Sequence, residues 1–404
     1  MRFGKQGCYC LQSDKSKLEM PLRVCITSVC GPLSICGPSE NEFQQRINKA
    51  SGGQIQVTFV NNRRRYHHDG STIAAPGESE YPSLWVLSYP AMCLWKLPSL
   101  AKQDILVADG IGLPGVVVCL LSKLFKKKSM ITIHGHFEEE WSVKKHSTIE
   151  NMLFAVAMKF ILRFANTFVA NDQQIAQKLI SKDIQSSRVS VRRVFADTRK
   201  FSRTSVEEKE FQKFTTRFGL PDKYVLYVGR LTAWDGAQDM LDIVKRVHNA
   251  VPDTRFVLIG DGPLKAYIGQ FIADNNLNGI VFQIDRLDHH LMPYIYYGAD
   301  VVVCPLHPPQ SGVGRITLEA LSMEVPVIAY DAGELNLVVR NEETGCLVPE
   351  GDTALMAART ISLLLDPDLK TKLGRNGRKL VQCDYDVDAY IGNWLQSLYR
   401  LGST

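Results

Sequence analysis

The sequence contains no apolar run of the roughly 18 residues that a membrane-spanning helix needs. The longest candidate extends from Gly112 to Leu121 and is followed closely by Lys123. The first twenty residues mix polar and charged types and lack the apolar core of a secretory leader. These absences argue against an integral membrane protein, and we expect a cytoplasmic one.

The sequence also lacks a cysteine pattern, because its ten cysteines in 404 residues are ordinary usage and form no C-x-x-C pair. Cys25, Cys119 and Cys304 lie in apolar segments, where cysteine behaves as a small hydrophobic residue. We therefore expect a reduced protein without a disulfide framework or a metal site. Cys8 and Cys10 fall in residues 1–21, which we interpret as a disordered N-terminal extension.

Neither sign of charge dominates, since 47 basic side chains face 42 acidic ones for a net charge of +5. This balance permits an anionic ligand or a membrane surface, and we expect no nucleic-acid partner. With 45% hydrophobic residues the chain can bury sizeable cores, which excludes a disordered or collagen-like protein. At about 150 residues per domain, the length suggests two to three domains.

Short apolar segments alternate with longer helical ones in two successive series, which predicts an α/β protein with two doubly wound, Rossmann-like domains facing each other across a cleft. We expect a first domain at 22–205 and a second domain at 206–386, joined by a charged segment at 201–223. The helix at 387–401 has an apolar stripe and should pack back on the first domain. The predicted strands are 22–29, 54–60, 104–109, 129–134, 166–170 and 188–194, then 224–228, 254–259, 279–284, 299–304 and 325–330.

A G-x-G-x-x-G pattern occurs at residues 110–115, between a predicted strand and a predicted helix. Such glycines can let the backbone approach a dinucleotide pyrophosphate. However, this pattern follows an interior strand, and no acidic residue ends the next strand, at Met130 to His134. We favour a plain strand-to-helix turn over a dinucleotide site.

The second predicted domain carries a stronger set of ligand-binding signals. Arg230 stands just beyond the carboxyl end of the domain's first strand, where open α/β sheets bind ligands. Gly312 and Gly314 open a helix, so backbone N–H groups and the helix dipole could hold a phosphate there. Glu319 lies within that helix, and its carboxylate could accept hydrogen bonds from the vicinal hydroxyls of a ribose.

From Tyr224 to Asp352 the chain closely resembles the family 4 (group 1) glycosyltransferases, and more weakly from residue 22 to 400. The motifs that carry the likeness are Gly229-Arg230-Leu231, Gly260-Asp261-Gly262-Pro263, Gly298-Ala299-Asp300, Gly312-Val313-Gly314, Leu318-Glu319-Ala320, Val325-Pro326-Val327-Ile328-Ala329, Gly333-Glu334 and Thr344-Gly345-Cys346-Leu347-Val348-Pro349. The resemblance implies the GT-B fold and a retaining hexosyltransferase that uses a nucleotide-diphosphate sugar. It also implies that no metal or other cofactor is required.

The resemblance assigns roles to individual residues. It places Arg230 on the donor diphosphate, Glu319 on the ribose and His134 near the transferred sugar, with Gly37 in an N-terminal glycine loop. We add Arg315 as a second cation for the diphosphate. The candidate catalytic residues are thus Arg230, His134 and Arg315. The candidate donor-binding residues are Gly229, Arg230, Gly262, Ser311, Gly312, Val313, Gly314, Arg315 and Glu319.

Two positions depart from the family pattern. The usual lysine five residues after the arginine is Asp235, and the first glutamate of the Glu-x7-Glu motif is Ser311. A carboxylate beside an anionic leaving group should slow transfer, so these departures leave catalytic competence open. The alternatives to a transferase are a non-catalytic nucleotide-sugar-binding member of the same fold and a sugar-nucleotide 2-epimerase.

The acceptor would be a glycan or a lipid-linked sugar bound by the first domain. Basic runs at Arg63–Arg65 and Lys126–Lys128, and the apolar helix 151–165, resemble features that relatives use at anionic membranes. Peripheral membrane association is therefore one interpretation. In the other interpretation, the basic runs are a solvated loop and a charged helix end, and the apolar helix belongs to the core.

Overall fold

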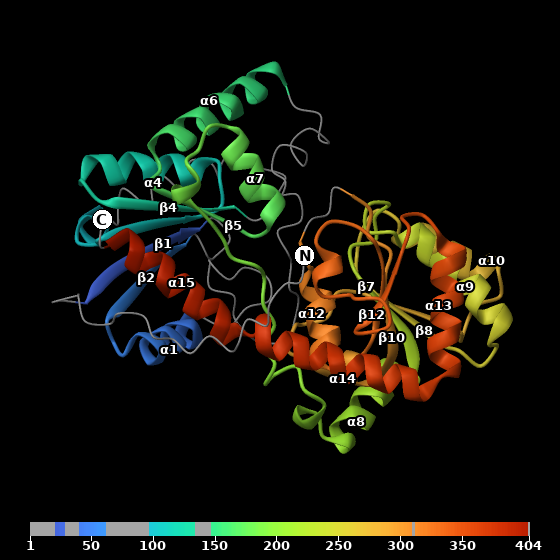
Figure 1. Cartoon of the computed structure of the whole chain (residues 1–404). Helices are drawn as coiled ribbons and strands as arrows, with labels where there is room; N and C mark the ends of the chain where they lie inside the picture. Colours follow the sequence, from blue (N-terminus) through green and yellow to red (C-terminus); the bar gives the residue numbers. More distant parts are fainter. Residues whose placement is uncertain (1–20, 29–39, 62–96, 134–146, 309–311, 403–404) are drawn as a thin grey trace. The chain divides into compact units, whose positions relative to one another are not determined.

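A computed structural model describes residues 21–28, 40–61, 97–133, 147–308 and 312–402 (Figure 1). The predictions that concern residues 1–20, Gly37, Arg63–Arg65, His134 and Ser311 therefore lie outside the described residues. The chain divides into two compact units, one formed by residues 1–192 with 391–404 and the other by residues 193–390. None of the helices within the described ranges is long and apolar enough to span a bilayer.

Unit 1 contains a parallel sheet in the order β2-β1-β3-β4-β5-β6. Its central strands are buried on both faces, which explains their nearly continuous apolar sequences. The strands are β1 (Leu22–Ser28), β2 (Ile55–Asn61), β3 (Ile105–Asp109), β4 (Lys128–Ile133), β5 (Thr167–Ala170) and β6 (Val189–Val191). The helices are α1 (Glu40–Ser51), α3 (Leu97–Ala101), α4 (Leu113–Leu124), α6 (Thr148–Phe164), α7 (Gln173–Ser181) and the part of α15 (Val387–Gly402) that begins at residue 391.

Helix α15 returns the end of the chain to unit 1. Its buried stripe includes Ile391, Trp394 and Leu398. At its end, an ideal Cβ on Gly402 would lie 3.2 Å from the side chain of Leu22 on β1. The stripe seen in the sequence is thus buried, and the end of α15 lies against the first strand of the unit.

The glycine pattern at residues 110–115 forms the turn between β3 and α4. Gly110 and Gly112 have φ angles of 113° and 86°, which favour glycine, and Gly115 lies against Ile161 of α6. The next strand, β4, ends at Ile133 without an acidic residue. These features fit the strand-to-helix turn predicted from the sequence.

Unit 2 contains a second parallel sheet, ordered β12-β11-β10-β7-β8-β9. Counted along the unit, this is the 3-2-1-4-5-6 order of Rossmann-type sheets. The strands are β7 (Tyr224–Val228), β8 (Phe256–Ile259), β9 (Val281–Ile284), β10 (Ala299–Cys304), β11 (Val327–Tyr330) and β12 (Gly345–Val348). The helices are α8 (Glu208–Phe218), α9 (Ala237–Ala250), α10 (Lys265–Asp274), α11 (Met292–Gly298), α12 (Arg315–Ser322), α13 (Thr353–Leu365) and α14 (Pro367–Asp384).

Two elements of unit 2 differ from the sequence prediction. The charged segment expected as a linker contains helix α8, whose Phe211 and Phe214 are buried against rings of α11. The charged residues lie on the opposite face of α8, and their number made the segment resemble a linker in the sequence. Strand β12 was also missed, because four residues are too short to produce a clear periodic signal.

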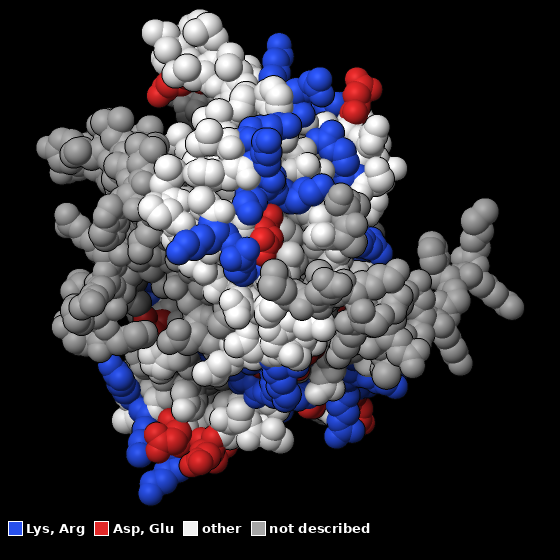
Figure 2. All heavy atoms as spheres, turned by 90° about the vertical axis from the view of Figure 1, so that its left-hand side faces the viewer, with Lys and Arg blue, Asp and Glu red and all other residues white. Residues whose placement is uncertain are grey.

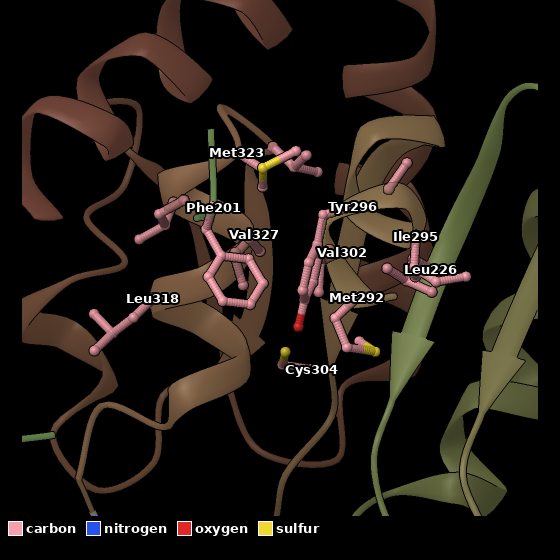
Figure 3. Close-up of a cluster of buried hydrophobic side chains, with 14 of the residues drawn as sticks. Phe201, Leu226, Met292, Ile295, Tyr296, Val302, Cys304, Leu318, Met323 and Val327 are labelled. Atoms are coloured by element: carbon pink, nitrogen blue, oxygen red, sulfur yellow. The ribbon is translucent and has the colours of Figure 1, made fainter. Parts of the chain in front are cut away.

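A large apolar core lies on one side of the unit 2 sheet (Figure 3). It joins Leu226 of β7 and Val302 of β10 to Ile295 and Tyr296 of α11 and Leu318 of α12. The second core, on α9 and α13, includes Val225, Val301 and Ile328, so successive residues of one strand enter opposite cores. The position of α12 is therefore fixed by its packing in the first core.

Candidate functional site

The strand order of unit 2 brings the main sequence candidates to one edge of its sheet. Strands β7 and β10 are neighbours, yet their connections run to opposite sides, which makes this pair the topological switch point. Arg230 follows the carboxyl end of β7, and the chain from Pro305 to Arg315 follows that of β10. Loops at such a switch point commonly bind ligands in open α/β sheets.

The loop after β7 contains an ion pair between Arg230 and Asp235, the acidic residue that departs from the family pattern. Arg230 Nε lies 3.2 Å from Asp235 Oδ2, and the Thr232 hydroxyl donates to the same oxygen. The Asp235 side chain is only 10% exposed, whereas that of Arg230 is 68% exposed. Asp235 therefore has a cationic partner within its own loop, and the guanidinium group keeps an open face.

Glycines allow the loops around this site to approach one another. An ideal Cβ on Gly236 would lie 1.8 Å from the carbonyl oxygen of Pro305, and one on Gly262 would lie 2.6 Å from that of Leu231. The Gly229 N–H donates to Ile259 of β8, and the Leu231 N–H to Asp261. Gly229 and Gly262 thus shape the backbone between β7 and β8.

The start of α12 presents uncapped backbone donors. Gly312 and Gly314 have φ angles of 80° and 65°, and no side chain within the described ranges caps the helix. Val313 between them is buried in the core and anchors the turn. The Nη1 atom of Arg315 is buried, and no residue in the described parts of the chain pairs with it. Three features that favour an anion are therefore adjacent: glycine turns, the backbone N–H groups of a helix start, and a guanidinium nitrogen without a partner among the described residues.

Glu319 lies one turn further along α12 and is held on both carboxylate oxygens. His289 Nε2 is 2.8 Å from Oε1, and the Tyr296 hydroxyl donates to Oε2 at 3.1 Å. The other ring nitrogen of His289 is 2.9 Å from Lys200 Nζ. The carboxylate is only 5% exposed, so these partners replace the water it would otherwise bind.

A second polar cluster fixes the chain just before the glycine loop. His307 lies between Asp239 of α9, at 3.0 Å, and Glu350 beyond β12, at 2.8 Å. Tyr330 of β11 donates to the same Asp239 oxygen, and its pKa is raised mainly by burial and further by that bond. The backbone N–H of His307 also donates to the backbone carbonyl of Trp234, so a hydrogen bond joins the loops after β7 and β10.

Sequence reasoning missed the partners of the predicted residues. His289 lies 30 residues before Glu319 and Lys200 lies 89 before His289, so no spacing rule connects them. One signal was available, since His289 and His307 both follow the carboxyl ends of strands, at the ligand-binding edge. Of the predicted residues, Gly229, Arg230, Gly262, Gly312, Val313, Gly314, Arg315 and Glu319 all belong to unit 2.

Comparison with known proteins finds a family model that matches most of unit 2. The family model for glycosyl transferases, group 1, matches residues 208–380, which cover the site from the loop after β7 to α14. The matched residues, 208–380, all lie within unit 2.

The curated proteins that are similar to this chain include sugar transferases. The alpha-D-kanosaminyltransferase of Streptomyces kanamyceticus is 30% identical over 185 residues, which is 46% of this chain and 47% of the relative. The sulfoquinovosyl transferase of Arabidopsis thaliana is 22% identical over 393 residues, covering 91% of this chain and 71% of that protein. For the first of these relatives, as for several others, the match spans about half of the relative's length or less.

Solved structures of similar fold extend over nearly the whole chain. Anabaena HepE in complex with UDP has a TM-score of 0.68 and 18% identity, covering 94% of this chain and 100% of HepE. Sucrose-phosphate synthase from Thermosynechococcus elongatus has a TM-score of 0.70 and 20% identity, covering 94% and 98%. At these identities the likeness concerns the fold, which is the GT-B type with two Rossmann-like units.

Proposed function

We propose that the protein is a retaining hexosyltransferase that moves a sugar from a nucleotide-diphosphate donor to an acceptor hydroxyl. The observation that carries the proposal is the buried Nη1 of Arg315, without a partner among the described residues, beside the uncapped start of α12. An unpaired buried donor costs about 1–3 kcal/mol, which a bound diphosphate would offset. The match of residues 208–380 to the family model for glycosyl transferases, group 1, supports the same proposal.

The chemistry follows from the charge that develops on the leaving group. The acceptor oxygen forms a bond to the anomeric carbon while the bond from that carbon to the diphosphate breaks. The acceptor proton passes to the departing phosphate oxygen on the same face, which retains the anomeric configuration. Arg230, Arg315 and the N-terminus of α12 would stabilise the diphosphate electrostatically, because they are placed before the reaction begins.

We expect no metal requirement, because in this proposal two cations and a helix N-terminus would offset the charge of the diphosphate. Treatment of the purified protein with EDTA should therefore leave the transfer rate unchanged. A loss of activity that Mg²⁺ or Mn²⁺ restores would contradict this part of the proposal.

Asp235 does not by itself argue against activity, because Arg230 neutralises it within the loop. The relatives reported above are named as transferases or synthases, which favours transfer over 2-epimerisation. A non-catalytic member would bind the donor without releasing nucleoside diphosphate when acceptors are supplied. Release of nucleoside diphosphate thus separates the transferase from this alternative.

The decisive first experiment is a panel of nucleotide sugars screened by thermal stabilisation. UDP-sugars have priority, because Anabaena HepE was solved with UDP and with UDP-glucose. A ligand at 100 times its Kd stabilises the native state by about 2.7 kcal/mol. Arg315→Ala should abolish most of the shift, whereas Arg375→Ala, at an exposed position of α14, serves as a control. If no member of the panel raises the melting temperature, the proposal fails.

We further propose that unit 1 docks on an anionic bilayer that carries a lipid-linked acceptor. Ile149, Met152, Leu153 and Val156 of α6 follow an i, i+3, i+4, i+7 pattern and are 59–66% exposed. This apolar stripe faces solvent rather than the core. Lysine and arginine side chains gather on the upper part of the unit 1 face in Figure 2.

Basic and apolar side chains lie close together at the C-terminal end of α6. Lys159 and Arg163 are exposed on that helix, and Lys123 of α4 lies 5.5 Å from the Phe164 ring centroid. An apolar stripe beside cations is the pattern of helices that lie in a bilayer interface. Phosphatidylglycerol-containing vesicles should therefore bind the protein more strongly than phosphatidylcholine vesicles, and salt should weaken the binding.

The vesicle experiment has a matched control. The double variant Met152→Gln/Leu153→Gln should lose most vesicle binding in flotation, because it removes half of the stripe. Leu365→Gln changes an equally exposed leucine on α13 of unit 2 and should bind like the native protein. Equal binding by all three proteins would rule out α6 as the docking element.

A further inference from the structure

The carboxylate of Glu319 is enclosed and fully oriented before any ligand arrives. Its side chain is 5% exposed, and each oxygen receives one hydrogen bond, from His289 and from Tyr296. A carboxylate offers about four acceptor positions, so one position on each oxygen is left for a ligand. Two acceptor positions on adjacent oxygens match two vicinal hydroxyl groups.

The direction of the hydrogen bonds around His289 follows from its neighbours. The ammonium group of Lys200 can only donate, so His289 Nδ1 must accept at 2.9 Å. The proton of a neutral imidazole then lies on Nε2, which donates to Glu319 Oε1 at 2.8 Å. Lys200 therefore selects the tautomer that makes His289 a donor to the carboxylate.

Aromatic packing holds the imidazole in this orientation. The Phe201 ring lies 5.3 Å from the His289 ring and 5.9 Å from that of Tyr296. Figure 3 shows Phe201 and Tyr296 within the same buried cluster as Leu318, the residue before Glu319. Neither donor can turn away from the carboxylate without disturbing this core.

We propose that His289 is a positioning residue, which acts through Glu319 to set recognition of the donor ribose, and that Lys200 fixes its tautomer. This inference rests on the proposed function, because it assumes that a ribonucleoside diphosphate binds unit 2. It adds that ribose recognition depends on a residue 30 positions away from the glutamate. Loss of the His289 donor should free Oε1 to rotate and lower the affinity for the two ribose hydroxyls.

The test compares a ligand that has the vicinal hydroxyls with one that lacks them. UDP, GDP and ADP are screened first, and the tightest is compared by calorimetry with its 2′,3′-dideoxy analogue. In the native protein the ribonucleotide should bind about tenfold more tightly or better, as expected for hydrogen bonds to a carboxylate. Glu319→Gln should remove most of this preference.

Variants of His289 then separate positioning from general stability. His289→Leu should reduce the ribose preference to about threefold or less, with little change in dideoxy-ligand affinity. His289→Gln keeps an N–H group at a similar reach and should restore the preference. Lys200→Met should give an intermediate value, and His290→Leu, at the exposed neighbouring histidine, should behave like the native protein.

Each outcome bears on one of the two proposals. If the native protein binds none of the three diphosphates, the proposed function fails. If it binds with a ribose preference that His289→Leu and Lys200→Met leave intact, the positioning role alone is overturned. An equal loss of affinity for both ligands would assign His289 a structural role and also overturn it. Should His289→Leu not fold, His289→Gln and Lys200→Met still decide the question.

Discussion

At the scale of single residues, Asp235 shows how a local partner changes the meaning of a substitution. The sequence placed a carboxylate where the family has a lysine, next to an anionic leaving group. In the structure the carboxylate is nearly buried and bonded to Arg230 and Thr232. A lysine at this position would lose both bonds, so restoring the family residue is not the informative change.

We predict instead that Asp235→Asn increases the affinity for a nucleoside diphosphate by about threefold to tenfold, because it releases the charge of Arg230 from its partner. The Asn amide can still accept from Thr232, so the loop should keep its shape. Calorimetry with UDP checks the result, and Arg230→Ala should bind more weakly than the native protein. Unchanged affinity in Asp235→Asn would mean that Arg230 does not contact the diphosphate.

Arg315 gives a second prediction at this scale. Its buried nitrogen has no partner within the described residues, so a cation is available at the start of α12. Arg315→Ala should lower the transfer rate about 10²-fold, as expected when one preorganised donor is removed. Arg315→Lys should recover little, because a lysine cannot make a bidentate contact. A fully active Arg315→Ala protein would exclude this residue from the reaction.

At the scale of elements, α8 is the clearest difference between expectation and structure. Its apolar residues point inward from a strongly charged sequence, and the Phe214 ring stacks on Tyr294 at 5.4 Å. We predict that Phe214→Ala lowers the free energy of unfolding by about 3–5 kcal/mol, as for other large core truncations. Lys209→Ala, on the exposed face of α8, should change it by less than about 0.5 kcal/mol.

Urea denaturation followed by circular dichroism measures both α8 variants. If Phe214→Ala is as stable as Lys209→Ala, then α8 is a loosely attached linker after all.

The order of the other elements near the site follows from apolar alternation, and there the sequence prediction agrees with the structure to within a few residues.

At the scale of the whole molecule, the two units have separate apolar cores. We therefore predict two calorimetric transitions, of which a saturating nucleoside diphosphate raises only that of unit 2, by roughly 5–10 °C. Hydrogen exchange should assign the shifted transition to peptides from residues 193–390. A single transition would show that the two units unfold as one cooperative body, and equal shifts of two transitions would contradict binding to unit 2 alone.

The sequence alone determined the fold class, because strands buried on both faces of a parallel sheet leave continuous apolar runs between helical segments. It also located the candidate site, since Arg230 and Gly312–Arg315 follow strands whose carboxyl ends share one edge. Only the tertiary structure paired Arg230 with Asp235 and placed His289, Tyr296 and Lys200 around Glu319. The physical reason is that side-chain partners are chosen by distance in space. Residues 30 or 89 positions apart become neighbours through the packing of the strands and helices between them.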